Sequence, residues 1–246
     1  MIRTLPPELG GAKYAASVEG GLKYLRPNAA GIDPLLVGVA KRYVRPGNTV
    51  WDVGANLGLF SWIAAGLAGS QGSVLAVEPD PWLASQLQRA RFANQLRDIA
   101  PVEIIVGAAG ASWTASRLCI AQSGRAANYL EGFGSTVTDG LRHSYMAIVF
   151  PVDHLLEHFR PPDLVKIDVE GSEAEVLEGA QKTLATYRPI CLIEIRPSFA
   201  DFGDWLRDCG YDLFDASTSD FAQGRLTPIR TVAYNTLAIP HDVSTK

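Results

Sequence analysis

Segments typical of buried strands alternate with helical segments along most of this 246-residue chain. Strand-like runs rich in Val, Ile and Leu lie at 49–55, 73–79, 102–110, 163–169 and 190–195. Helical patterns follow four of these runs, at 57–69, 81–95, 172–187 and 199–210. Because parallel strands need crossover connections, this alternation favours a parallel sheet with helices on both faces. The sequence therefore predicts an α/β fold with a doubly wound, mostly parallel sheet.

The length of the chain fits one large domain with additions to it. Residues 1–33 are rich in Gly and Pro and are expected to form an N-terminal extension or cap, while 34–246 form the main domain. An insertion at about 111–152 interrupts the alternation and contains two further strand-like runs. The last two strand-like runs, at 211–216 and 231–240, have no helix between them, so we expect an antiparallel hairpin at the C-terminus.

Charge and hydropathy exclude several classes of protein. The chain has 22 Lys and Arg against 26 Asp and Glu, a net charge of −4, and no cluster of basic residues. Nucleic-acid binding needs clustered positive charge, so no nucleic-acid partner is expected. No run reaches the ~18 apolar residues of a membrane-spanning helix, and residues 1–11 lack the apolar core of a signal peptide. We therefore expect a cytoplasmic protein without a membrane span.

A glycine turn joins the first predicted strand to its helix in the stretch VWDVGANLGLFS. Gly54 and Gly58 permit a tight turn and a close approach of the backbone to a ligand, and Ala55 lies between them. Asn56 tolerates left-handed backbone angles, so the turn survives without a third glycine. Glu78 and Pro79 end the second strand. An acid at that place is positioned to bind the ribose hydroxyls of an adenosine-containing cofactor.

The charge of Asp52 favours one cofactor over another. This carboxylate lies two residues before Gly54, where it would repel the pyrophosphate of a dinucleotide. It would instead suit the ammonium and sulfonium groups of S-adenosylmethionine. The sequence therefore favours S-adenosylmethionine over NAD.

Three charged residues alternate with apolar ones in LVKIDVEGSE, residues 164–173. Side chains two apart share one face of a strand, so Lys166, Asp168 and Glu170 are expected to point the same way, into a crevice at the carboxyl edge of the sheet. Asp168 would lie near cofactor and acceptor and is the first candidate for a general base, with Glu170 and Glu194 as second candidates. Lys166 would stabilise a developing alkoxide or pair with the carboxylates. A purely structural ion network is the alternative.

The sequence resembles the FkbM family of S-adenosylmethionine-dependent methyltransferases. The matching stretches are VWDVGANLGLFS, VLAVEPDP, VKIDVEGSEAEVLEGA and RPICLIEI, within about 36–200. The resemblance implies the seven-stranded class I methyltransferase sheet with an antiparallel C-terminal strand, a catalytic domain over 34–246, and O-methylation of a sugar, glycolipid or polyketide-like hydroxyl. Two positions depart from the family pattern, namely Arg196, where a His is frequent, and His154, where an acid is frequent.

Several alternatives stay open. A nucleotide-dependent oxidoreductase and a non-catalytic cofactor-binding subunit are the rival functions. Asp168, Glu170 and Glu194 offer oxygen ligands for a divalent metal ion, but no spacing supports such a site and no metal ligand is assigned. In the insertion, Asn128, Tyr129, Phe133 and Ser135 are candidate contacts to a small-molecule or saccharide-bearing hydroxyl acceptor. The oligomeric state is open, a homodimer included.

Overall fold

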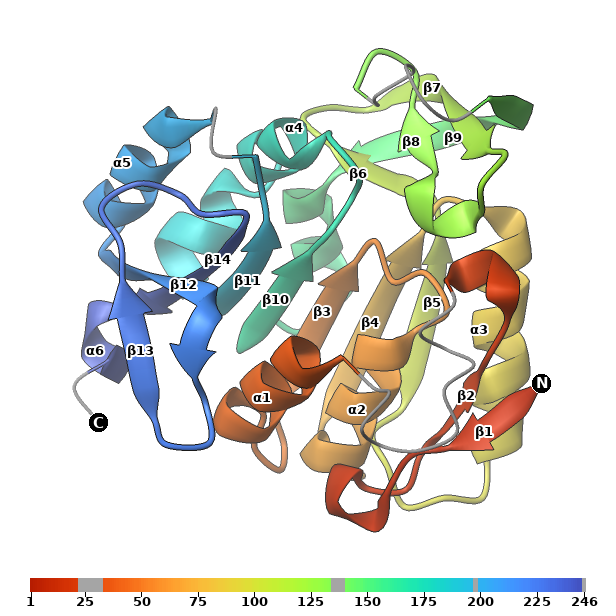
Figure 1. Ribbon diagram of the computed structural model, residues 1–246, viewed down its shortest axis with the longest axis horizontal. Coiled ribbons are helices and arrows are strands. Elements are labelled where there is room, and N and C mark those ends of the chain that lie inside the picture. Colours follow the sequence, from red (N-terminus) through yellow and green to blue (C-terminus); the bar gives the residue numbers. More distant parts are fainter. Residues whose placement is uncertain (22–32, 134–139, 197–198, 245–246) are drawn as a thin grey trace.

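The main sheet of the computed structural model has eight strands (Figure 1). The structure describes residues 1–21, 33–133, 140–196 and 199–244. Across the sheet the strands follow the order β13 (Arg225–Pro228), β12 (Tyr211–Asp220), β14 (Asn235–Pro240), β11 (Ile190–Glu194), β10 (Leu164–Ile167), β3 (Thr49–Val53), β4 (Ser73–Glu78) and β5 (Val102–Val106). Strands β11, β10, β3, β4 and β5 are parallel to one another, whereas β14 pairs antiparallel with both β11 and β12, and β13 pairs antiparallel with β12.

Helices cover both faces of this sheet. They are α1 (Pro34–Tyr43), α2 (Leu59–Ala68), α3 (Pro81–Asn94), α4 (Glu173–Glu178), α5 (Ala200–Asp208) and α6 (His241–Ser244). Successive residues of β3 point to opposite faces of the sheet. Val50 packs in the core beneath α1, α2 and α3, whereas Trp51 packs in the core beneath α4 and α5. The predicted doubly wound α/β arrangement is therefore observed. Among the described residues, no helix is long and apolar enough to cross a membrane.

The sheet differs from the sequence prediction at its C-terminal edge. The two predicted last strands do pair antiparallel, as β12 and β14, but β14 lies between β11 and β12. A short strand, β13, pairs with the outer edge of β12 and adds an eighth strand to the seven expected. The predicted helix over 172–187 is also divided, because α4 ends at Glu178 and a separate π-helical segment covers Thr183–Tyr187.

The insertion forms a second sheet of four strands at the carboxyl ends of β3 and β4 (Figure 1). Its order is β6 (Ala108–Gly110), β9 (Leu141–Pro151), β7 (Thr114–Ala121) and β8 (Tyr129–Leu130). The predicted strand at 102–110 is divided at Gly107 between the two sheets. A small apolar cluster that includes Leu118, Ile120 and Val149 holds the second sheet together.

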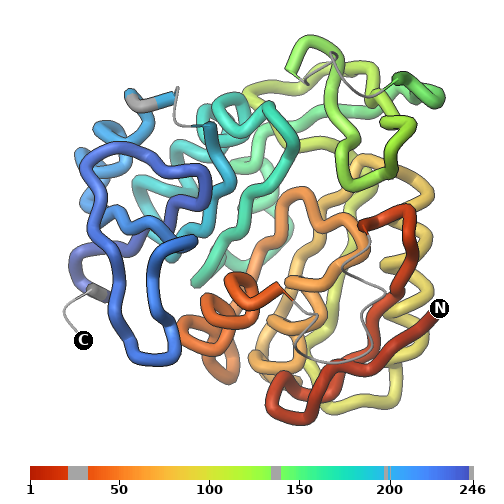
Figure 2. Tube along the Cα trace, in the orientation of Figure 1, coloured from red at the N-terminus to blue at the C-terminus, as the bar shows by residue number. Residues whose placement is uncertain are grey.

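The N-terminal residues pack along α2 and α3 (Figure 2). Strands β1 (Ile2–Thr4) and β2 (Lys13–Ala15) form an antiparallel hairpin. The Asn94 side chain at the end of α3 donates to the carbonyl of Lys13 at 2.6 Å and accepts from its amide at 2.7 Å. Further along, Gly20 lies so close to the glycine turn that an added Cβ would be 2.3 Å from Leu57. The N-terminal segment therefore reaches the predicted cofactor loop.

Candidate active site

The glycine turn has the geometry that its sequence predicts. The amides of Gly54 and Ala55 both donate to the carbonyl of Val77 at 3.0 Å, which joins the end of β3 to β4. Asn56 has a φ of 54°, in the left-handed region. Gly54 has a φ of 80°, and a Cβ there would lie 1.8 Å from the carbonyl oxygen of Asp168. The turn thus packs backbone against backbone, and only glycine fits at its first position.

Asp52 and Lys166 form a buried ion pair beneath this turn. The Lys166 Nζ lies 3.2 Å from Asp52 Oδ1, 3.2 Å from Asp168 Oδ2 and 3.1 Å from the carbonyl oxygen of Gly54. Ser61 Oγ donates to the other carboxylate oxygen of Asp52 at 2.6 Å. Burial alone would lower the pKa of Lys166, but attraction by Asp168 and Asp52 outweighs it and raises that pKa. Lys166 is therefore a charged link between the turn and the end of β10.

The three charges of the KIDVE stretch lie at different depths. Lys166 is buried, Asp168 is half-buried and Glu170 is exposed. Their order from the floor of the crevice to its mouth is as expected. However, β10 ends at Ile167, so Asp168 and Glu170 lie beyond the strand and their direction is not set by its alternation. Glu170 instead has a φ of 57° and lies in a left-handed turn before Gly171.

Glu78 is almost fully buried at the end of β4. Its Oε2 accepts from the Asn56 amide and its Oε1 from the Asp80 amide, each at 2.8 Å. Burial raises the pKa of Glu78 to about 7, against the lowering effect of these two hydrogen bonds. Each carboxylate oxygen has a second lone pair, so the group can also accept from a ligand hydroxyl.

A cavity with about 630 Å³ of empty space, part of it open to solvent, lies between the glycine turn and the second sheet. The candidate residues that line it are Gly54, Asn56, Glu78, Pro79, Asp168 and Glu170. Asp52 and Lys166 lie beneath it, Ala55 and Gly58 shape the turn, and Glu194 lies outside the lining. Among the insertion candidates, Asn128 and Tyr129 line the cavity, Phe133 packs on the second sheet, and Ser135 falls outside the described residues.

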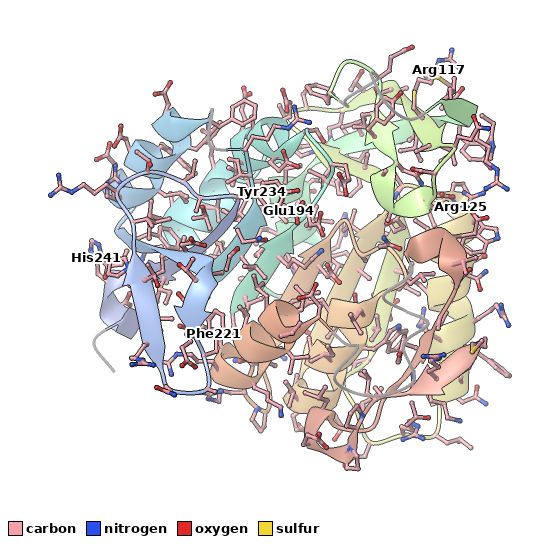
Figure 3. All side chains as sticks on the ribbon, in the orientation of Figure 1. Arg117, Arg125, Glu194, Phe221, Tyr234 and His241 are labelled. Atoms are coloured by element: carbon pink, nitrogen blue, oxygen red, sulfur yellow. The ribbon has the colours of Figure 1, made fainter. Side chains whose placement is uncertain are left out.

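The structure adds Asp80 and Arg125, which sequence reasoning did not assign to the site. Asp80 is fully buried and caps α3 by accepting from the Trp82 amide at 2.8 Å. Its other oxygen accepts from the Arg125 guanidinium and from Asn128 Nδ2, the latter at 2.8 Å. The Arg125 guanidinium also lies 4.9 Å from the centre of the Trp82 ring. These contacts fix the insertion over the start of α3, where Arg125 is labelled in Figure 3, and Arg125 is among the residues that line the cavity.

Three carboxylates meet at the mouth of the cavity. The ligand atoms of Asp168, Glu170 and Glu194 lie within 4.8 Å of one another, and Tyr234 donates its hydroxyl to Glu194 (Figure 3). Glu170 as a residue is exposed, yet partial burial of its carboxyl group, with repulsion from Asp168 and Glu194, raises its pKa to about 7. Burial and repulsion from Asp168 also raise the pKa of Glu194. Crowded acids of this kind share protons, and the same oxygen set is one that a hard cation binds.

The comparison with known protein families identifies this arrangement. The family model described as "Methyltransferase FkbM domain" matches residues 52–213, which is more than half of the chain. The chain belongs to the FkbM methyltransferase family. The match begins at Asp52 and includes the glycine turn, Glu78, the KIDVE stretch and Glu194. The resemblance noted from the sequence is thereby confirmed.

Two relatives of this FkbM-family chain show how far the likeness extends. A hexuronic acid methyltransferase, AglP of Haloferax volcanii, is 31% identical over 139 residues, or 56% of this chain and 52% of that protein. The chain thus spans about half the length of this curated relative. The crystal structure of the methyltransferase FkbM from Methylobacillus flagellatus KT is 17% identical and superimposes with a TM-score of 0.51, over 78% of this chain and 43% of that one. The superposition with this crystal structure supports the α/β fold of the present chain.

Proposed function

We propose that the protein is an S-adenosylmethionine-dependent O-methyltransferase that acts on a hydroxyl group of a saccharide-bearing acceptor. The observation that carries the proposal is that the glycine turn, Glu78 and the carboxylates of Asp168 and Glu170 line one cavity. The name of AglP, a hexuronic acid methyltransferase, supports the saccharide as acceptor class. The family match supports methyl transfer as the reaction.

The residues at the floor of the cavity fit the cofactor. A side chain at Gly54 would collide with the backbone of Asp168, so glycine keeps the turn packed against the end of β10, where Gly54 lines the cavity. Glu78 would accept hydrogen bonds from the ribose hydroxyls, beside Asn56 and Pro79. Asp52 acts through Lys166 and the turn, because it is fully buried and lies outside the cavity lining. S-adenosylmethionine supplies an already activated methyl group, so the protein mainly aligns and deprotonates the acceptor.

Glu170 fits the role of general base better than Asp168, the first candidate from the sequence. A base works best when its pKa lies near the operating pH, and burial, with repulsion from Asp168 and Glu194, raises the pKa of Glu170 to about 7. Asp168 is instead held by Lys166 at 3.2 Å, so it is suited to positioning and to balancing charge. Glu194 would act through Glu170 by keeping its pKa raised.

Binding of S-adenosylmethionine and of S-adenosylhomocysteine should be measurable by calorimetry, and Glu78→Ala should weaken both. Loss of a hydrogen-bonded buried carboxylate costs about 1.5–3 kcal/mol, so we expect a roughly 10- to 100-fold loss of affinity. Glu103→Ala is the matched control, because Glu103 is an exposed acid that pairs with Arg91 on the surface. Preferential binding of NAD would favour an oxidoreductase. Binding without turnover on any hydroxyl acceptor would favour a non-catalytic subunit.

The rate of methyl transfer should rise with pH through about 7. Glu170 must be ionised to accept a proton, and its raised pKa leaves it mostly protonated below that pH. For one such base, kcat/KM at pH 6 should be about tenfold lower than at pH 8. Glu170→Gln should remove this dependence and lower the rate by about 10²- to 10⁴-fold.

Glu194→Gln provides the companion variant, because removing a repelling carboxylate should lower the pKa of Glu170. Its pH profile should therefore shift towards acid while turnover persists. A Glu170→Gln enzyme that keeps the wild-type profile would show that another group is the base.

A further inference from the structure

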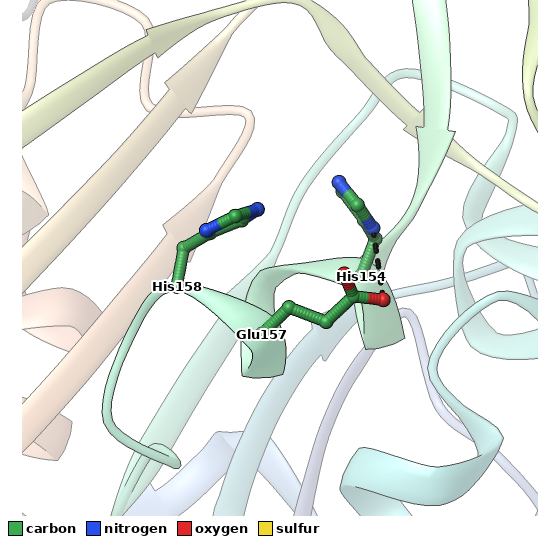
Figure 4. A group of neighbouring side chains, drawn as sticks. All are labelled: His154, Glu157 and His158. Carbon is green, nitrogen blue, oxygen red and sulfur yellow. Dashed lines mark ion pairs between the residues drawn. The ribbon is translucent and has the colours of Figure 1, made fainter.

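Two histidines and a glutamate gather on the turn between β9 and β10 (Figure 4). His154 and Glu157 lie on the 3-10 turn Val152–Glu157, and His158 follows it directly. The Nδ1 of His154 lies 3.3 Å from Oε1 of Glu157. The two imidazole rings are 5.4 Å apart at an angle of 77°, and one ligand atom from each of the three residues lies within 4.8 Å of the others. None of the three lines the cavity described above.

The backbone beneath this group is firmly anchored. Val152 and Leu155 are buried in the core, so the turn cannot move outward without exposing them. Asp153 accepts hydrogen bonds from the amide of Lys182 at 2.8 Å and from the amide and hydroxyl of Thr183 at 2.7 Å each. The ring of Trp113 packs edge-on against His154 at 4.8 Å. The three polar side chains therefore project from a fixed support.

We propose that His154, Glu157 and His158 bind a divalent transition-metal ion of the Zn²⁺ type. Two imidazoles and one carboxylate are a common zinc donor set that leaves a fourth position for water. With bonds of about 2.0–2.1 Å, neighbouring ligand atoms of a tetrahedral site lie about 3.3–3.4 Å apart. The His154–Glu157 separation of 3.3 Å matches this edge.

Completion of the site needs only side-chain movement. His158 and Glu157 are exposed and His154 is half-exposed, so their rings and carboxylate can rotate to bring ligand atoms from 4.8 Å to contact distance. Imidazole nitrogens favour zinc, copper and nickel over magnesium and calcium. Bound metal would brace the turn that leads into β10, the strand that carries Lys166. The site is structural and lies apart from the proposed methyl-transfer cavity.

Calorimetric titration of the metal-free full chain with Zn²⁺ tests the site. We expect one equivalent to bind and to raise the melting temperature in a concentration-dependent way. His154→Gln and His158→Gln should each weaken binding at least tenfold, whereas His143→Gln, a change to a histidine that contacts Tyr145 on the second sheet, should leave it unchanged. Mg²⁺ should bind at least tenfold more weakly than Zn²⁺.

The location of the bound metal ion is tested separately by tryptophan fluorescence. Cu²⁺ should quench the emission of Trp113, and the quenched component should be absent in Trp113→Phe. Glu170→Gln should keep wild-type Zn²⁺ binding, and loss of binding in that variant would assign the ion to the acidic cluster instead. The proposal is overturned by that result, by unchanged binding in the two histidine variants, or by a folded wild-type chain that does not bind Zn²⁺.

Discussion

Gly54→Ala should abolish cofactor binding and destabilise the fold by about 3 kcal/mol or more, at or above the upper end of what overpacking a core usually costs. The added Cβ would lie 1.8 Å from the carbonyl oxygen of Asp168 and 2.7 Å from its carbonyl carbon. Both are backbone atoms, so relief requires the turn and the end of β10 to separate. That movement would pull the Lys166 Nζ from the Gly54 carbonyl, which it contacts at 3.1 Å.

Gly69→Ala is the control that separates the steric collision expected at Gly54 from the backbone strain of a positive φ. Gly69 also has a positive φ, 62°, but an added Cβ there would meet nothing within 4 Å. Gly69 has a ψ of 178°, a conformation that costs an alanine about 1–3 kcal/mol, so this variant should lose that amount of stability and keep its cofactor affinity. Denaturant unfolding and calorimetry on both proteins provide the comparison. Equal losses of stability would show that the close approach at Gly54 is not the cause.

The local part of this fold and site was predictable because it follows from short-range rules. Alternating strand and helix patterns predicted β3, α2, β4 and α3, and the tolerance of Asn for left-handed angles predicted the conformation of Asn56. The polar loop of the insertion offers candidate contact residues in the sequence, and two of them, Asn128 and Tyr129, line the cavity.

The parts that sequence reasoning missed depend on partners distant in the chain. Arg125 reaches Asp80 across 45 residues, and nothing in the local pattern around either residue indicates that contact. Strand β13 is only four residues long and mostly exposed. It therefore lacks the alternation of buried and exposed residues by which a strand is recognised in a sequence. The KIDVE stretch was read as one strand face, but the left-handed residues Glu170 and Gly171 turn the chain after β10.

Lys166 is where the local and the long-range parts of the site meet. Strand register places it opposite Asp52 on the neighbouring β3, and the close turn at Gly54 supplies a carbonyl acceptor. Asp168, two residues further on, supplies the second carboxylate. Sequence alone left two roles open for this lysine, stabilisation of an alkoxide or pairing with carboxylates. The structure shows the pairing, and the two roles predict different mutant phenotypes.

Lys166→Met should lower the free energy of unfolding by about 3–5 kcal/mol, the usual effect of leaving a buried charge without its partner. Asp52 is fully buried and, of its side-chain hydrogen bonds with the described residues, would keep only the one from Ser61. The double variant Asp52→Asn/Lys166→Met should recover part of that loss, because it removes the stranded charge, and denaturant unfolding measures both. Since Lys166 also lowers the pKa of Glu170, the acid limb of methyl transfer should move to higher pH in Lys166→Met. A variant that is as stable as wild type but has lost turnover at every pH would instead assign Lys166 to the alkoxide.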